Sequence, residues 1–114
     1  MQETAVGLFG NTGVADTVVD SLRAHGIPSR AIRVRTAPNG MAANGFGSEF
    51  RREMKAMGIA DHEAEAYLDG LERGHVLIQV TGSRQQAAET LKIMNEFAAL
   101  EIDAFANAAV SGTP

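Results

Sequence analysis

Residues 57–81 read MGIADHEAEAYLDGLERGHVLIQVT and place an acidic helix directly before the most strand-like segment of the chain. Apolar side chains recur in the first part at three- and four-residue spacing, which is the period of a helix with one buried face. Asp61 stands where a helix N-cap is expected, and Arg73 followed by Gly74 is typical of a helix end. The pattern predicts a helix whose buried stripe comprises Ala64, Tyr67, Leu68 and Leu71.

The segment that follows alternates between two sets of side chains, as a half-buried β-strand does. Residues 75–81 are therefore predicted to form a strand in the interior of an antiparallel sheet. One face of this strand comprises Val76, Ile78 and Val80, and the other comprises His75, Leu77, Gln79 and Thr81.

The same stretch resembles a known family. The run GIADHEAEAY from Gly58 to Tyr67, followed by Gly70, Arg73-Gly74 and Val76-Leu77-Ile78, is similar to the signature of bacterial general-stress (heat-induced stress) protein domains. The likeness covers roughly residues 4–106, with His75 where a small residue is expected. It implies a small cytoplasmic module that is associated with the stress response.

Length and composition bound the class of protein. The 114 residues, of which 45% are hydrophobic and 21% charged, suffice for one globular domain. The chain has no cysteine, which excludes disulfides, thiolate metal sites and cysteine nucleophiles. The net charge of −4 argues against nucleic-acid binding. Because no apolar run is long enough for a membrane span and no signal peptide is evident, we expect a cytoplasmic protein that binds no membrane.

The remaining patterns predict further strands at about 4–9, 31–36 and 101–107. Asn11 or Thr12 can cap the helix after the first strand, and a capping box of Ser83 and Gln86 opens the last helix. The order β-α-β-(α-α)-β-α-β predicts an α+β ferredoxin-like βαββαβ sandwich. This fold has four antiparallel strands in the order 4-1-3-2 and two main helices on one face.

We predict a single domain, 1–114, with a core at about 4–107 and a frayed tail at 108–114. Residues 37–47 are rich in Gly and Asn, so they are expected to form the most mobile internal loop. Ser48 can then cap a short helix, and residues 37–58 together form an insert between the second and third strands. The apolar stripe of this helix comprises Phe50, Met54 and Met57.

Glycines after the first strand raise the question of a nucleotide site. Gly7, Gly10 and Gly13 have the spacing G-x-x-G-x-x-G, which differs from both dinucleotide and P-loop patterns. We interpret them as a tight strand-to-helix turn.

Catalytic and metal motifs are also weak. Asp61, Glu65 and Asp69 share a helix face beside His62, and a divalent metal could use such oxygens with one imidazole. A solvated acidic face is commoner, however, and Asp69 can instead pair with Arg73. No nucleophile elbow is present. We therefore predict no catalytic residue, no metal and no cofactor.

The sheet face opposite the main helices is the most informative candidate surface. We expect the main helices to cover Val6 and Leu8, so the opposite face presents an apolar patch of Phe9, Leu77 and Phe105. Such a patch indicates an interaction surface. Either the insert or a second chain could cover it, and we favour a second chain in a homodimer. The cationic side chains on this face are Arg33, Arg35 and His75.

Three functions fit this surface, and fold analogy alone does not separate them. The first, which we favour, is a non-catalytic association module that forms a homodimer or larger oligomer, or binds an unknown protein partner. The second is a regulatory domain that senses an anionic small molecule through Arg33, Arg35 and His75. The third is RNA binding through sheet aromatics, which the net charge and the missing aromatic motif oppose.

Overall fold

The computed structural model describes residues 2–37, 46–97 and 101–106, the last of these and Phe46 by their backbone alone. Its elements in chain order are β1 (Gln2–Phe9), α1 (Thr12–Ala24), a 3₁₀ turn (Ser29–Ala31), β2 (Ile32–Arg35), α2 (Phe46–Ala56), α3 (Asp61–Glu72), β3 (Val76–Ser83), α4 (Arg84–Glu96) and β4 (Glu101–Ala106).

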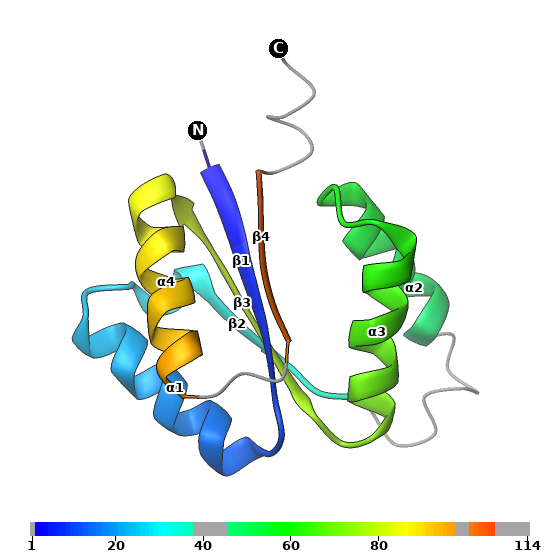
Figure 1. The fold of residues 1–114 in the computed structure, drawn as a ribbon, viewed down its shortest axis with the longest axis horizontal. Coiled ribbons are helices and arrows are strands. Elements are labelled where there is room, and N and C mark those ends of the chain that lie inside the picture. The colour runs from blue at the N-terminus through cyan, green and yellow to red at the C-terminus, as the bar shows by residue number, and fades with distance from the viewer. Residues whose placement is uncertain (1, 38–45, 98–100, 107–114) are drawn as a thin grey trace.

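The strands form an antiparallel sheet in the order β2-β3-β1-β4. Helices α1 and α4 lie on one face of this sheet, and α2 and α3 lie on the other (Figure 1). The predicted α+β class with an antiparallel sheet is confirmed, and β3 lies inside the sheet as predicted. The predicted loop extends too far, because Phe46 and Gly47 belong to α2; residues 38–45 and the predicted tail lie outside the described residues.

Helix ends in the second layer follow the glycine signals. Gly74 has a φ of 90°, and its N–H donates to Leu71 O, while the N–H of His75 donates to Gly70 O. This pair of bonds is a Schellman motif, which satisfies the last carbonyls of α3. Gly58 closes α2 in the same way, with φ 88° and a bond from Ile59 N to Met54 O. Both turns therefore end a helix where the sequence predicts it.

Helix starts agree with the sequence in two cases and differ in two. Asn11 accepts a bond from Val14 N, and the predicted capping box at Ser83 forms. Asp61 is not the N-cap of α3, because Ala60 holds that position and Asp61 lies in the first turn. Ser48 is not the N-cap of α2, since the helix already begins two residues earlier.

Two apolar cores flank the sheet. The core under α1 and α4 contains Phe9, Ala15, Val18, Leu22, Ile27, Val76, Ile78, Val80, Ile93 and Met94. The core under α2 and α3 contains Val6, Leu8, Phe50, Met54, Ile59, Ala64, Tyr67, Leu68, Leu71 and Leu77. The sheet is thus covered by helices on both faces.

The prediction of which side chains of β1 point to which face of the sheet is wrong, and the two faces are exchanged. Val6 and Leu8 point to α2 and α3, while Phe9 lies with the α1/α4 core. The sequence pattern could not assign the two faces of β1, because the side chains on both are apolar and buried. Close packing assigns them. A Cβ on Gly7 would lie 2.6 Å from Met94 Sδ, so α4 packs on the face of β1 that contains Gly7.

The predicted exposed patch of Phe9, Leu77 and Phe105 is therefore wrong for the two residues whose side chains are described. Phe9 and Leu77 lie on opposite faces, and Leu77 is 0% exposed under the insert. Phe105 pairs with Thr4 on β1, and its side chain lies outside the described residues. Phe50 and Met54 of the insert are also fully buried. The insert, rather than a second chain, covers this part of the sheet.

Within the described ranges, no helix is long and apolar enough to cross a membrane.

Candidate functional site

The three predicted ligand residues lie on or beside the sheet face that α2 and α3 cover. Arg33 and Arg35 on β2 pair with Gln79 and Leu77 on β3. Because directly paired residues share a face, both arginine side chains start from the face of the α2/α3 core. His75 lies just before β3, in the turn that closes α3.

Arg35 has a structural role. Its Nη1 donates to Glu53 Oε2 on α2, and its guanidinium lies 5.3 Å from the centroid of the Phe50 ring. The side chain is only 12% exposed. A guanidinium that pairs with a carboxylate and stacks on an aromatic ring is held in place. Arg35 therefore fastens α2 to the edge strand and is not available for a ligand.

His75 is also separate from any pocket around Arg33. Its half-buried ring lies against α3, where a Cβ on Gly70 would be 3.3 Å from His75 Nδ1. That nitrogen is buried and has no hydrogen-bond partner in the described chain. The predicted trio of Arg33, Arg35 and His75 does not converge on one site.

Arg33 instead lines a pocket at the β2 edge of the sheet, which we call the β2 pocket. The pocket has a volume of about 450 Å³, within the range of small-ligand sites. Its lining residues come from β1, the 3₁₀ turn, β2, the end of α2 and β3. They are Gln2, Arg30, Ala31, Arg33, Met57, Gln79 and Thr81.

The charge of the β2 pocket differs from that of the protein. Arg30 and Arg33 both line it, and no described lining residue is acidic. Neither arginine forms an ion pair with any described residue, whereas Arg35, Arg51, Arg73 and Arg84 all do. The whole chain has a net charge of −4. A concave site with two unneutralised cations on an acidic protein concentrates positive potential, which attracts anions.

The inner wall of the β2 pocket is polar. Gln79 is only 6% exposed, and its Nε2 donates to Met57 Sδ at 3.5 Å. Its Oε1 is buried and has no partner in the described chain. Thr81, the next residue on the same face, shares a hydroxyl hydrogen bond of 3.0 Å with Thr4. Two cations thus line the pocket, and one residue of its wall contains a buried amide oxygen that has no described partner.

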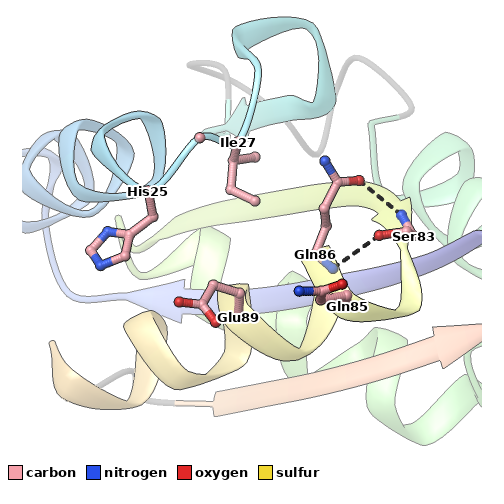
Figure 2. Close-up of a pocket in the computed structure, with 7 residues that line it drawn as sticks. His25, Ile27, Ser83, Gln85, Gln86 and Glu89 are labelled. Carbon is pink, nitrogen blue, oxygen red and sulfur yellow. Dashed lines mark hydrogen bonds between the residues drawn. The ribbon is translucent and has the colours of Figure 1, made fainter.

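A second cavity, of about 460 Å³, lies between the end of α1 and the start of α4. Figure 2 shows that Ser83 and Gln86 in its wall are hydrogen-bonded to each other, which is the capping box of α4. His25 Nδ1 is bonded to Ser21 O. Since these polar groups already have structural partners, the cavity offers a ligand less than the β2 pocket does.

Carboxylates of the acidic helix α3 form ion pairs. Asp69 pairs with Arg73 at 3.0 Å, as the spacing predicts. Glu65 pairs with Arg51 of α2, and the hydrogen bond from that guanidinium lowers the pKa of Glu65. Among the described residues, no group of three or more histidines and carboxylates could hold a metal ion.

In comparisons with protein-family models, curated proteins and solved structures, nothing matches this chain. The function must therefore be argued from the β2 pocket itself.

Sequence reasoning found one cation of the pocket and missed the other. It placed Arg33 and Gln79 on one sheet face but gave Gln79 no role, and it did not consider Arg30. The signal that could have found them is register, because an antiparallel pairing of 31–36 with 75–81 sets Arg33 opposite Gln79. Nothing in the sequence indicates that Met57 covers this site.

Proposed function

We propose that this protein is a non-catalytic domain that binds a small anionic ligand in the β2 pocket. One observation carries the proposal: Arg30 and Arg33 line one cavity that has no described acidic side chain, and no described residue neutralises either of them.

The chemistry of arginine defines the anion. A guanidinium presents a planar fork of N–H donors that matches the oxygens of a carboxylate or a phosphate. Arg33 lies on a strand and Arg30 on the 3₁₀ turn just before it, so short, hydrogen-bonded backbone elements hold both. The ligand class is therefore a small carboxylate or phosphate, and the volume of about 450 Å³ suits a molecule of this size.

Thermal unfolding tests the proposal. A ligand that binds only the folded state stabilises it by RT ln(1 + [L]/Kd). A ligand concentration of 100 times the Kd therefore adds about 2.7 kcal/mol to the free energy of unfolding. We expect succinate or inorganic phosphate to raise the unfolding temperature of the unmodified protein and of Arg23→Gln. Arg23 is an exposed cation at the end of α1, so this variant makes the same charge change away from the pocket. We expect Arg33→Gln to lose most of the stabilisation. An equal response of both variants, or no response of the unmodified protein, would contradict the proposal.

We propose that the fold is the ferredoxin-like βαββαβ sandwich with an insert of α2 and α3. The strand order β2-β3-β1-β4 and the antiparallel pairing support this assignment, as do α1 and α4 on a common face. The insert makes it a three-layer variant. An experimental structure with β2 and β4 exchanged in the sheet would refute it.

Self-association is a second candidate function, and one observation favours it. Val34 is an exposed large apolar side chain, with 48% of its surface accessible, and its strand β2 lies at the edge of the sheet that the described strands form. Antiparallel pairing of two β2 edges about a twofold axis would bury both copies of Val34. Sedimentation analysis should then show a dimer that Val34→Lys dissociates. A monomeric unmodified protein at micromolar concentration would rule this out.

The kinship with general-stress protein domains also stays a proposal and rests on the run from Gly58 to Tyr67. The cytoplasmic location that this kinship implies is likewise a proposal. An abundance of the protein that does not change after heat shock would count against the kinship.

A further inference from the structure

The amide of Gln79 gives the β2 pocket a second recognition element. Gln79 is 6% exposed, so its amide has left bulk water. Its Oε1 is buried and has no partner in the described chain. Buried side-chain oxygens in folded proteins nearly always accept a hydrogen bond. An orphaned acceptor in the wall of a cavity therefore points to a missing donor.

Met57 covers this amide. It follows the last turn of α2, is half-buried and packs against the α2/α3 core. Its Sδ accepts from Gln79 Nε2 at 3.5 Å, and a thioether is a weak acceptor. Methionine has an unbranched, flexible side chain that moves at little cost. Displacement of its thioether would expose the amide to a molecule in the pocket.

We propose that the ligand of the β2 pocket carries an N–H or O–H donor in addition to its anionic group. The anionic group lies against Arg30 and Arg33, and the donor reaches Gln79 Oε1 once the Met57 thioether has moved. This inference rests on the proposed function and narrows its ligand class from any small anion to an anion with a donor, such as a hydroxy acid or a hydroxylated phosphate ester.

The expected difference in affinity between ligands with and without a donor follows from the free energy of one hydrogen bond to a buried acceptor. A partner for such an oxygen is worth about tenfold in affinity, which corresponds to about 1.4 kcal/mol. Two anions that differ only in a hydroxyl group should therefore differ about tenfold in Kd, with the hydroxylated one tighter.

Isothermal titration of the full chain with two matched pairs of probes tests this. Malate and succinate differ by one hydroxyl on a dicarboxylate, and glycerol 1-phosphate and propyl phosphate differ by hydroxyls on a phosphate ester. We expect the hydroxylated member of at least one pair to bind about tenfold more tightly. The pair that shows the preference identifies the anionic group as carboxylate or phosphate.

Variants then locate the acceptor. Gln79→Met keeps the length of the side chain and removes the amide, so we expect it to bind both members of the pair equally. Gln85→Met removes an exposed amide on α4, outside the β2 pocket, and should keep the preference. Met57→Ala removes the thioether and keeps the Gln79 amide in place, so it should tighten malate more than succinate even if Gln79→Met folds poorly.

The outcomes separate this inference from the proposed function. Equal affinities of both members of each pair for the unmodified protein would overturn the inference and leave anion binding intact. A preference that survives Gln79→Met, or that Gln85→Met abolishes, would also overturn it. If none of the four probes binds, the proposed function fails together with the inference.

Discussion

Substitution of Gly70 by alanine tests how the insert packs on the sheet. Gly70 lies inside α3, and it is buried. A Cβ at this position would be well inside van der Waals contact with Leu8 Cδ2, and 3.3 Å from both Leu8 Cδ1 and His75 Nδ1. Leu8 is itself buried in the α2/α3 core, so its side chain has little room to turn away.

Two effects oppose each other in Gly70→Ala. Alanine in a helix interior is favoured over glycine by about 0.5–1 kcal/mol. Overpacking of a filled core costs about 1–3 kcal/mol. The structure therefore predicts net destabilisation of about 1 kcal/mol, although helix propensity alone predicts the opposite sign.

Gly47→Ala is the matched control. Gly47 lies near the start of α2, and its Cβ would meet Arg51 Nη1 at 3.4 Å and Leu68 Cδ2 at 3.5 Å, which are ordinary contacts. Here only propensity acts, and we expect a gain of about 0.5 kcal/mol. Urea unfolding at equilibrium measures both free energies of unfolding. If Gly70→Ala is as stable as Gly47→Ala, then α3 does not pack closely on β1 and the argument for a covered sheet face is wrong.

Three further predictions use the same unfolding assay or NMR. Leu77→Arg should unfold the protein, because it places a charge without a partner at a fully buried position. The control Val34→Arg, at the exposed edge of the sheet, should change the stability little. A folded Leu77→Arg variant would contradict the structure with two cores. Ser83→Ala should lose about 1 kcal/mol with the capping box, and no loss would show that the box does not form. Arg51→Gln should raise the pKa of Glu65 towards its ordinary value in an NMR titration, because the hydrogen bond that lowers it is gone. In the unmodified protein, the small contribution of this pair to stability should be present above the ordinary pKa of a glutamate carboxyl. It should be lost as the pH falls through the lowered pKa of Glu65. A Glu65 pKa that is unchanged in the variant would refute the pairing.

Local patterns predicted the elements well because they depend on short spacings. The stripe Ala64, Tyr67, Leu68 and Leu71 is buried in α3, and Val76, Ile78 and Val80 share one face of β3. Glycine turns and the capping box depend on four or five consecutive residues and were predicted for the same reason.

The facing of β1 and the cover of the sheet could not be predicted, because each depends on contacts between distant segments. Alternation shows that Val6 and Leu8 share a face, but both rows of β1 are apolar, and only the approach of Met94 to Gly7 assigns them. An apolar face also looks the same in sequence whether Phe50 and Met54 of the same chain cover it or a partner does. For this reason the prediction that a second chain covers this face was wrong.

The candidate site was predicted in part. Arg33 and Arg35 look equivalent on an alternating strand, but Glu53 and Phe50 on α2 hold Arg35, and only Arg33 lines the β2 pocket. Which cation is already paired is a property of packing between elements, so no spacing rule along the strand could separate the two.

Backbone amide shifts of ¹⁵N-labelled protein during titration with malate and succinate test the central claim most directly. Binding in the β2 pocket predicts saturable shifts at Arg30, Arg33, Met57, Gln79 and Thr81, with larger changes at Met57 and Gln79 for malate than for succinate. Saturable shifts confined to the cavity between α1 and α4, at His25 and residues 83–89, or no saturable shifts with either acid, would contradict it.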